Sequence, residues 1–110
     1  MLTRESIFSA CDLPTERVTV PEWGGEVIVC GLTAAQRDWY EQSMLGEDQK
    51  PDLTNARAKL AVLCVVDDSG LPIFKPADAE EIGKKSAAAL QRVVEVAQRL
   101  SGMDGAVEKK

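Results

Sequence analysis

Two short segments near the start of the chain, residues 16–20 and 26–30, are rich in β-branched residues and have the composition of strands. Between them, residues 21–25 read Pro-Glu-Trp-Gly-Gly, and this mixture of proline and glycine favours a turn. The pattern predicts an antiparallel hairpin. Because a lone hairpin is marginal in water, one of its faces is expected to pack on helices.

The best-marked helix follows the hairpin and begins at Thr33. Thr33 and Gln36 have the spacing of a capping box, in which each side chain accepts a hydrogen bond from the backbone N–H of the other residue. The helix is predicted to end near Gly46. Trp39 and Tyr40 lie among its apolar residues, so we expect both in the core.

The stretch 53–66 fits two kinds of element. Its apolar residues keep helical spacing and its alanines favour a helix, whereas residues 62–66 alone would fit a strand. We expect one helix of about 14 residues, because the longer pattern explains the whole stretch. Since this helix is apolar on most sides near its end, it should be central to the core.

The last predicted helix begins at Ser86 and ends at Gly102, with polar residues along one side. Shorter elements precede it: a helix over residues 3–11, a turn at 67–70, and a helix capped by Asp78 and closed at Gly83. The apolar stripe of the last helix consists of Ala89, Leu90, Val93, Val94, Ala97 and Leu100.

These elements predict an α+β fold that is predominantly helical, with one N-terminal β-hairpin packed on about four helices. Residues 1–102 are expected to form a single domain, because 110 residues suffice for one modest core. Residues 103–110 hold few apolar side chains and are predicted to be a flexible C-terminal tail.

The net charge of −5 argues against nucleic acid or an anionic membrane as the partner, because no basic stripe is present to neutralise phosphates. No apolar run approaches the roughly 20 residues that span a bilayer, and the first residues lack a secretory pattern. Three cysteines, Cys11, Cys30 and Cys64, are an odd number without close pairs. We interpret them as reduced, buried thiols of a cytoplasmic protein.

The absence of histidine removes the commonest activator of serine and cysteine nucleophiles and the commonest zinc ligand. The sequence has no CxxC spacing for a metal and no phosphate-binding glycine loop. The acidic pairs Asp67-Asp68 and Glu80-Glu81 are interpreted as a turn and a solvated helix face. We therefore expect no catalytic residue, no cofactor and no metal, and predict a domain that binds other proteins.

Trp23 is the main candidate for partner binding, because a turn does not need a large aromatic residue. It either folds back over the hairpin and covers the core, or faces a partner as an interface anchor. The candidate partner-binding residues are Pro21, Trp23, Gly24 and Gly25.

Several strings along residues 2–102 resemble one protein family. They are residues 20–25 (VPEWGG), 27–33 (VIVCGLT), 37–38 (RD), 55–58 (NARA), 65–70 (VVDDSG), 72–74 (PIF), 83–90 (GKKSAAAL) and 97–102 (AQRLSG). Together they resemble the tail assembly chaperones of long-tailed bacteriophages and prophages. The PEWGG string is the most specific of them, and no catalytic motif is carried over.

The resemblance implies a non-enzymatic factor of virion morphogenesis that acts in the cytoplasm of the bacterial host and is absent from the mature virion. Its expected partners are the phage tape measure protein and the tail tube protein, with self-association into an oligomer. The alternatives are a structural minor tail or head–tail connector protein of the virion, or an unrelated regulatory module.

Overall fold

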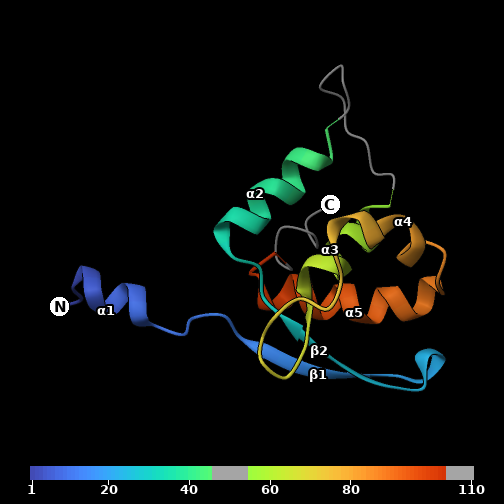
Figure 1. The fold of residues 1–110 in the computed structure, drawn as a ribbon, viewed down its shortest axis with the longest axis horizontal. Coiled ribbons are helices and arrows are strands. Elements are labelled where there is room, and N and C mark those ends of the chain that lie inside the picture. The colour runs from blue at the N-terminus through green and yellow to red at the C-terminus, as the bar shows by residue number, and fades with distance from the viewer. Residues whose placement is uncertain (46–54, 104–110) are drawn as a thin grey trace.

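The computed structural model describes residues 1–45 and 55–103, and its fold is α+β and mainly helical, as predicted. Figure 1 shows the helices gathered on one side of a small sheet, with the first helix held apart from them. In chain order the elements are α1 (Arg4–Ser9), β1 (Thr15–Val20), β2 (Gly25–Cys30), α2 (Ala34–Ser43), α3 (Ala56–Cys64), β3 (Val65–Val66), α4 (Ala79–Ile82) and α5 (Ala87–Leu100), with 3-10 turns at Pro21–Trp23 and Pro76–Asp78.

The predicted hairpin is confirmed as strands β1 and β2, which pair antiparallel with Val18 opposite Val27 and Arg17 opposite Ile28. A third strand, β3, pairs antiparallel with β2, so the sheet order is β1-β2-β3. The prediction of one helix over residues 53–66 is therefore wrong at its end. Helix α3 ends at Cys64, because the two β-branched residues that follow find backbone partners on β2.

Helix α5 confirms the predicted stripe: Ala89, Leu90, Val93, Val94 and Ala97 are buried, and Leu100 is partly buried. The Ser86 side chain caps the first turn by accepting from the Ala89 N–H. Gly102 takes a positive φ of 73° just after the helix. The Met103 N–H then donates to the Gln98 carbonyl at 2.7 Å, which closes the helix as a Schellman motif.

Met103 does not belong to a flexible tail, because it is buried against the core. Its backbone bond to helix α5 and its apolar side chain explain this position. The remaining residues of the predicted tail, 104–110, lie outside the described residues. The predicted loop at 47–52 and the predicted helix end at Gly46 lie outside them too.

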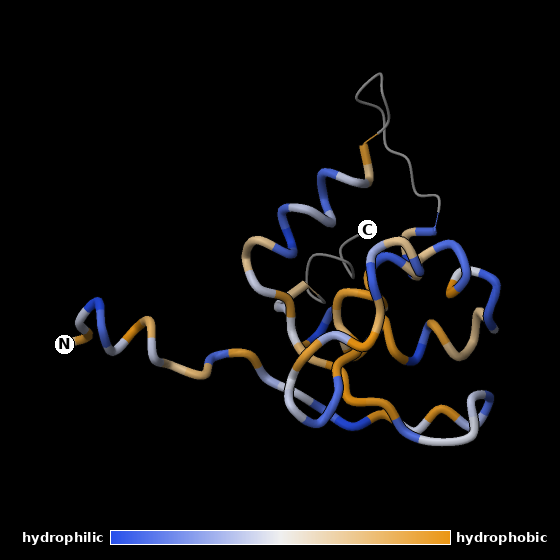
Figure 2. Tube along the Cα trace, in the orientation of Figure 1, coloured by the Kyte–Doolittle hydropathy of each residue, from blue (hydrophilic) through white to orange (hydrophobic). Residues whose placement is uncertain are grey.

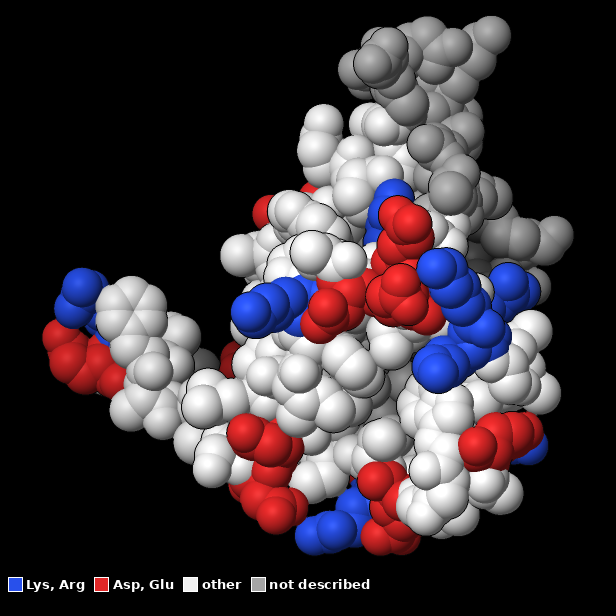
Figure 3. All heavy atoms as spheres, turned by 45° about the vertical axis from the view of Figure 1, so that its right-hand side comes forward, with Lys and Arg blue, Asp and Glu red and all other residues white. Residues whose placement is uncertain are grey.

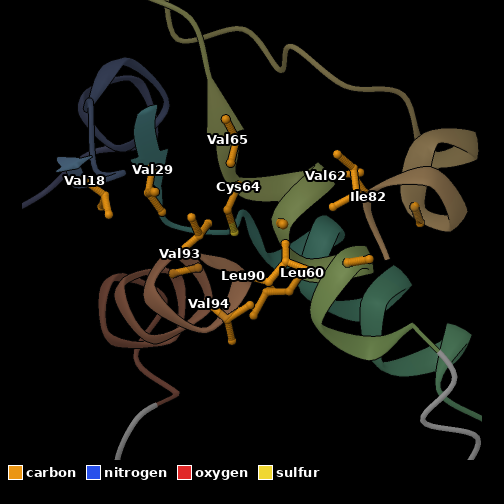
Figure 4. Close-up of a cluster of buried hydrophobic side chains, with 14 of the residues drawn as sticks. Val18, Val29, Leu60, Val62, Cys64, Val65, Ile82, Leu90, Val93 and Val94 are labelled. Carbon is orange, nitrogen blue, oxygen red and sulfur yellow. The ribbon is translucent and has the colours of Figure 1, made fainter. Parts of the chain in front are cut away.

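The core joins side chains of the sheet, α3, α4 and α5. Figure 4 shows Val93 between the sheet residues Val18 and Val29 and the α3 residue Cys64, while Leu60 faces Leu90. Fully burying one such side chain stabilises the fold by about 1.5–3 kcal/mol, so a charge at position 93 would be expected to prevent folding.

Helix α2 begins with the predicted capping box: the Gln36 N–H donates to the Thr33 Oγ1 at 3.1 Å, and the Thr33 N–H donates to the Gln36 Oε1 at 2.9 Å. Tyr40 is buried, with 8% of its surface exposed, but Trp39 is 42% exposed. The prediction that Trp39 is a core residue is thus wrong. Adjacent residues of a helix point about 100° apart, so only one of the two faces inward.

The shorter elements are confirmed in part. At the predicted turn, the Asp67 Oδ1 accepts from the Ser69 and Leu71 N–H groups, and Gly70 has a φ of 84°. Helix α4 ends at Gly83 as expected. Asp78 does not cap that helix, however, because its carboxylate accepts instead from the Lys75 N–H at 2.8 Å and closes the preceding 3-10 turn.

Candidate partner-binding surfaces

The tip of the hairpin brings the predicted partner-binding residues together. Pro21, Glu22 and Trp23 form a single 3-10 turn, which Gly24 ends with a φ of 78° and an N–H that donates to the Pro21 carbonyl at 3.1 Å. A side chain is strained at that φ, which explains the first glycine. Gly25 has no such requirement, and a Cβ added there would meet no atom within 4 Å.

The tip is fastened to helix α5 by its own side chains. The Glu22 carboxylate accepts a hydrogen bond from the Arg92 guanidinium, and this bond is the main reason why the pKa of Glu22 lies below its usual value. Trp23 is partly buried and packs against the core. Of its two expected positions, Trp23 therefore takes the one over the core, with part of the ring left at the surface. Pro21, Gly24 and Gly25 are exposed.

A second ion pair joins the sheet to the same helix. Arg99 donates two hydrogen bonds to the Glu16 carboxylate, at 2.8 and 2.9 Å. Near this pair, the Leu32 N–H donates to the Ser101 Oγ at 2.9 Å, 69 residues further along the chain. These bonds join the hairpin, including its tip, to α5 and the residue after it.

An open groove of about 550 Å³ lies between α2, α3 and α5. Its apolar lining comes from all three helices. On α5, Leu90 and Val94 line the groove, whereas Val93 faces the sheet. The described residues that line it are Tyr40, Met44, Asn55, Ala56, Arg57, Ala58, Gly83, Lys85, Ala87, Leu90, Gln91, Val94 and Gln98.

The rim of this groove is basic. Arg57 and Lys85 are its charged lining residues among those described, and no described carboxylate lines it, although the chain as a whole has a net charge of −5. The Arg57 Nε donates to the Gln91 Oε1 at 2.9 Å, which holds the guanidinium group beside α5. On the face that Figure 3 draws, acidic and basic side chains are intermixed.

Sequence reasoning missed this groove. The apolar stripe of α5 was predicted, but the groove also needs α2 and α3, which meet α5 only in the folded chain. The Lys59 Nζ, on α3, donates to the Ser43 carbonyl at the end of α2 at 3.0 Å. That hydrogen bond joins the two helices, and nothing in the local sequence predicts it.

The thiol groups differ in environment. Cys64 is buried, and desolvation raises the pKa of its thiol to about 12, with a further contribution from Cys30. Cys30 is partly buried and its pKa is also raised by desolvation. Cys11 is exposed, so the interpretation of all three as buried is wrong for that residue. Burial favours the neutral thiol, which is a poor nucleophile.

Other chemical features are sparse in the part of the chain that the structure describes. No group of three or more Asp, Glu or Cys residues there has the arrangement of a metal site. Asp67, Asp68, Glu80 and Glu81 are exposed, as their interpretation as turn and helix-face residues requires. Among the described helices, none combines the length and the apolar character needed to cross a membrane.

A small α+β fold with an apolar groove and a partly exposed aromatic tip has surfaces of the kind that protein-binding domains use. The sequence profile of the phage tail assembly chaperone family matches residues 12–110. The chain therefore belongs to the phage tail assembly chaperone family, as its resemblance had indicated. The role of that family is assembly rather than catalysis.

The fold is also that of a solved structure. The bacteriophage HK97 tail assembly chaperone is 19% identical in sequence and superimposes with a TM-score of 0.64, over 87% of this chain and 94% of that one. At this identity the likeness shows the shared fold. No curated protein sequence matches the chain significantly.

Proposed function

We propose that this chain binds the tape measure protein and helps to recruit tail tube subunits during tail assembly, in the cytoplasm of the bacterial host. The family match over residues 12–110 carries the proposal. In this proposal the protein leaves the tail before the virion is complete. Finding it in purified particles at the stoichiometry of a tail component would contradict this part and favour a structural tail or connector protein.

The groove between α2, α3 and α5 is the proposed site for the tape measure protein. An amphipathic helix binds by placing its apolar side in such a groove. The cations Arg57 and Lys85 favour a helix that carries carboxylates beside its apolar side. The exposed residues of the hairpin tip, Pro21, Gly24 and Gly25, with the outer part of Trp23, would form a separate contact for a tail protein.

Self-association is part of the proposal. One groove holds only a short helical segment, and several copies bound along an extended partner would reinforce one another. Linked weak sites commonly gain roughly 10²-fold or more in avidity. The expected complex is therefore an oligomer of this chain on one tape measure molecule.

Co-expression with the tape measure protein tests the groove. Reversing the charge with Lys85→Glu and Arg57→Glu should reduce the amount of tape measure protein captured by about tenfold. Lys84→Glu is the matched control, because Lys84 is the exposed neighbour of Lys85 and does not line the groove. Equal losses with Lys84→Glu and Lys85→Glu would remove the groove from the proposal.

Capture of the tail tube protein tests the tip. Gly25→Glu adds a charged side chain where the structure has open space, so the fold should persist while the contact is lost. Ala88→Glu, on the exposed first turn of α5, serves as the control. If Gly25→Glu captures as much tube protein as the unchanged chain does, the tip is not the contact.

A further inference from the structure

The large apolar side chains that remain exposed are concentrated at the start of the chain. Residues 1–13, called the arm from here on, include exposed Leu2, Ile7, Phe8 and Leu13. Figure 2 shows apolar positions recurring along the arm, outside the main body. An exposed apolar segment of this kind marks an interaction surface.

The arm has a defined local structure without a surface to pack on. Thr3 and Ser6 form a reciprocal capping box at the start of α1. The guanidinium group of Arg4 lies over the Phe8 ring, 4.6 Å from its centre. No residue of α1 is buried. Because a six-residue helix is marginal in water by itself, it needs a surface that covers its apolar side.

The outer face of the sheet, on the side away from α5, combines apolar residues with charged ones. Ile28 lies at its centre, opposite Arg17 on β1 and Val66 on β3. The segment after β3 continues this face: Pro72 bridges to Val66, and the Ile73 N–H donates to the Val65 carbonyl at 3.3 Å. Leu71 and Ile73 are 62% and 51% exposed there. Two shallow hollows of about 420 and 400 Å³ lie along the face.

Charge selects this face over the helical groove. On α1, Arg4 lies between Ile7 and Phe8, three residues from the first and four from the second, and it forms an exposed ion pair with Glu5, with 3.7 Å between the Arg4 Nη1 and the Glu5 Oε2. Because an ion pair this exposed contributes little, a surface that brings two further carboxylates to Arg4 would be a favourable partner. Asp67 and Asp68 line both hollows of the outer sheet face, and the one described cation that lines them, Arg17, is paired with Glu26 at 3.9 Å, so carboxylates outnumber cations there. The groove between α2, α3 and α5 presents cations instead, which would repel Arg4.

A short tether joins the arm to its own sheet, and the arm points away from that sheet. The Pro14 carbonyl accepts from the Gly31 N–H at 2.9 Å, so the chain is fixed to β2 at that point. Only four residues, 10–13, separate this point from the end of α1, and a proline disfavours any but an extended conformation in the residue before it. Figure 1 shows the arm directed away from the body.

We propose that the arm of one copy docks on the outer sheet face of a second copy. Ile7 and Phe8 cover Ile28 and Ile73, and the Arg4 guanidinium lies beside Asp67 and Asp68. Each copy carries one arm and one acceptor face, so the exchange either closes as a symmetric dimer or continues from copy to copy. This exchange supplies the surfaces for the self-association proposed above, and it does not depend on tape measure binding.

Sedimentation of the full chain over a range of concentrations tests the exchange. The unchanged chain should associate, and Phe8→Ser or Ile73→Ser should each weaken association by at least about tenfold, since each removes an apolar contact. Trp39→Ser is the control, because Trp39 is also a large side chain at the surface, 42% exposed, but lies on α2. Circular dichroism should show all three variants folded.

Two complementation experiments separate exchange from other modes of association. A mixture of Phe8→Ser and Ile73→Ser chains should form a mixed complex, because one chain keeps the acceptor face and the other keeps the arm. Arg4→Glu and Asp68→Lys should each weaken association, and the double variant should recover it.

A chain that is monomeric at all concentrations would overturn the proposal, as would an oligomer that Phe8→Ser leaves unchanged or that Trp39→Ser weakens equally. The proposed function is tested separately, because Phe8→Ser should still bind an isolated tape measure segment through the groove.

Discussion

The hairpin tip and the arm each present one aromatic residue near the start of the chain, yet they are built in opposite ways. At the tip, Trp23 packs against the core and the neighbouring Glu22 is bonded to Arg92 on α5. In the arm, Phe8 is 71% exposed and contacts Arg4 of the same short helix. The tip is a part of the folded body, whereas the arm is attached to it only through the segment before β1.

This difference separates two roles that the sequence does not distinguish. A large aromatic residue stabilises the chain that carries it when long-range contacts hold it in place. The same residue type serves association when its contacts are local, because its apolar surface is then left for another molecule. Substitution of Trp23 should therefore act on folding first, and substitution of Phe8 on association first.

Thiol reactivity gives the largest expected contrast between arm and body. Cys11 is exposed at the end of the arm, whereas Cys64 is buried with a pKa of about 12. We expect Cys11 to react with iodoacetamide at pH 8 at least ~10³-fold faster than Cys64. Timed alkylation followed by peptide mass spectrometry measures both rates. In denaturant the two rates should become similar, and a protected Cys11 in the dissociated chain would show that the arm packs on its own body.

Truncation of the two aromatic residues gives the next largest contrast. Trp23→Ala should lower the free energy of unfolding by roughly 2 kcal/mol, about half the cost of removing a fully buried tryptophan. Phe8→Ala should change it by less than about 0.5 kcal/mol. Urea denaturation at a concentration where the chain is dissociated measures both. Equal losses for the two variants would break the distinction between tip and arm.

The glycines at the two ends of β2 sharpen the comparison further. A Cβ at Gly31, beside the root of the arm, would lie 2.8 Å from the Leu100 carbonyl oxygen. Gly31→Ala should therefore cost about 1–2 kcal/mol through the backbone shift that it forces. Gly25→Ala, at the tip, meets open space and should be neutral or slightly stabilising. Thermal unfolding of the two variants tests this. If Gly25→Ala is destabilised, the tip requires glycine at this position.

The smallest expected effect concerns the ion pair that fastens the tip. The folded chain lowers the pKa of Glu22, so its carboxylate contributes stability at pH values above its ordinary pKa, near 4.5. That contribution is lost as the pH falls through the lower pKa of the folded state. Glu22→Gln should remove this part of the acid dependence, and Arg92→Gln should have the same effect. If the free energy of unfolding changes with pH in the same way for the unchanged chain and for both variants between pH 3 and pH 7, this prediction is wrong.

The elements with strong local signals could be predicted from the sequence. The capping box at Thr33, the hairpin around residues 21–25 and the stripe of α5 each depend on residues close together in the chain. Strand β3 could not be predicted in the same way, because Val65 and Val66 continue the apolar pattern of α3. Their strand conformation depends on pairing with β2, which lies more than 30 residues earlier.

The candidate sites were predictable only in part. The hairpin tip was identified because its residues are consecutive, but the anchoring of Glu22 to Arg92 links residues 70 positions apart. The groove depends on three helices, and its basic rim appears only when Arg57 and Lys85 are brought to the same opening. The arm was predicted as a helix, but nothing in its composition indicated that it would remain unpacked.

Helix α5 supplies much of the core and is the last helix among the described residues, which has a consequence for synthesis on the ribosome. Its contacts run back to β1 and β2, including the bond between Leu32 and Ser101. The hairpin and α3 emerge first, and although α4 covers part of α3, much of their apolar surface has no cover until α5 has been made. The chain must therefore complete its fold in one late step, and a nascent chain stalled before residue 87 would depend on cellular chaperones to stay out of aggregates.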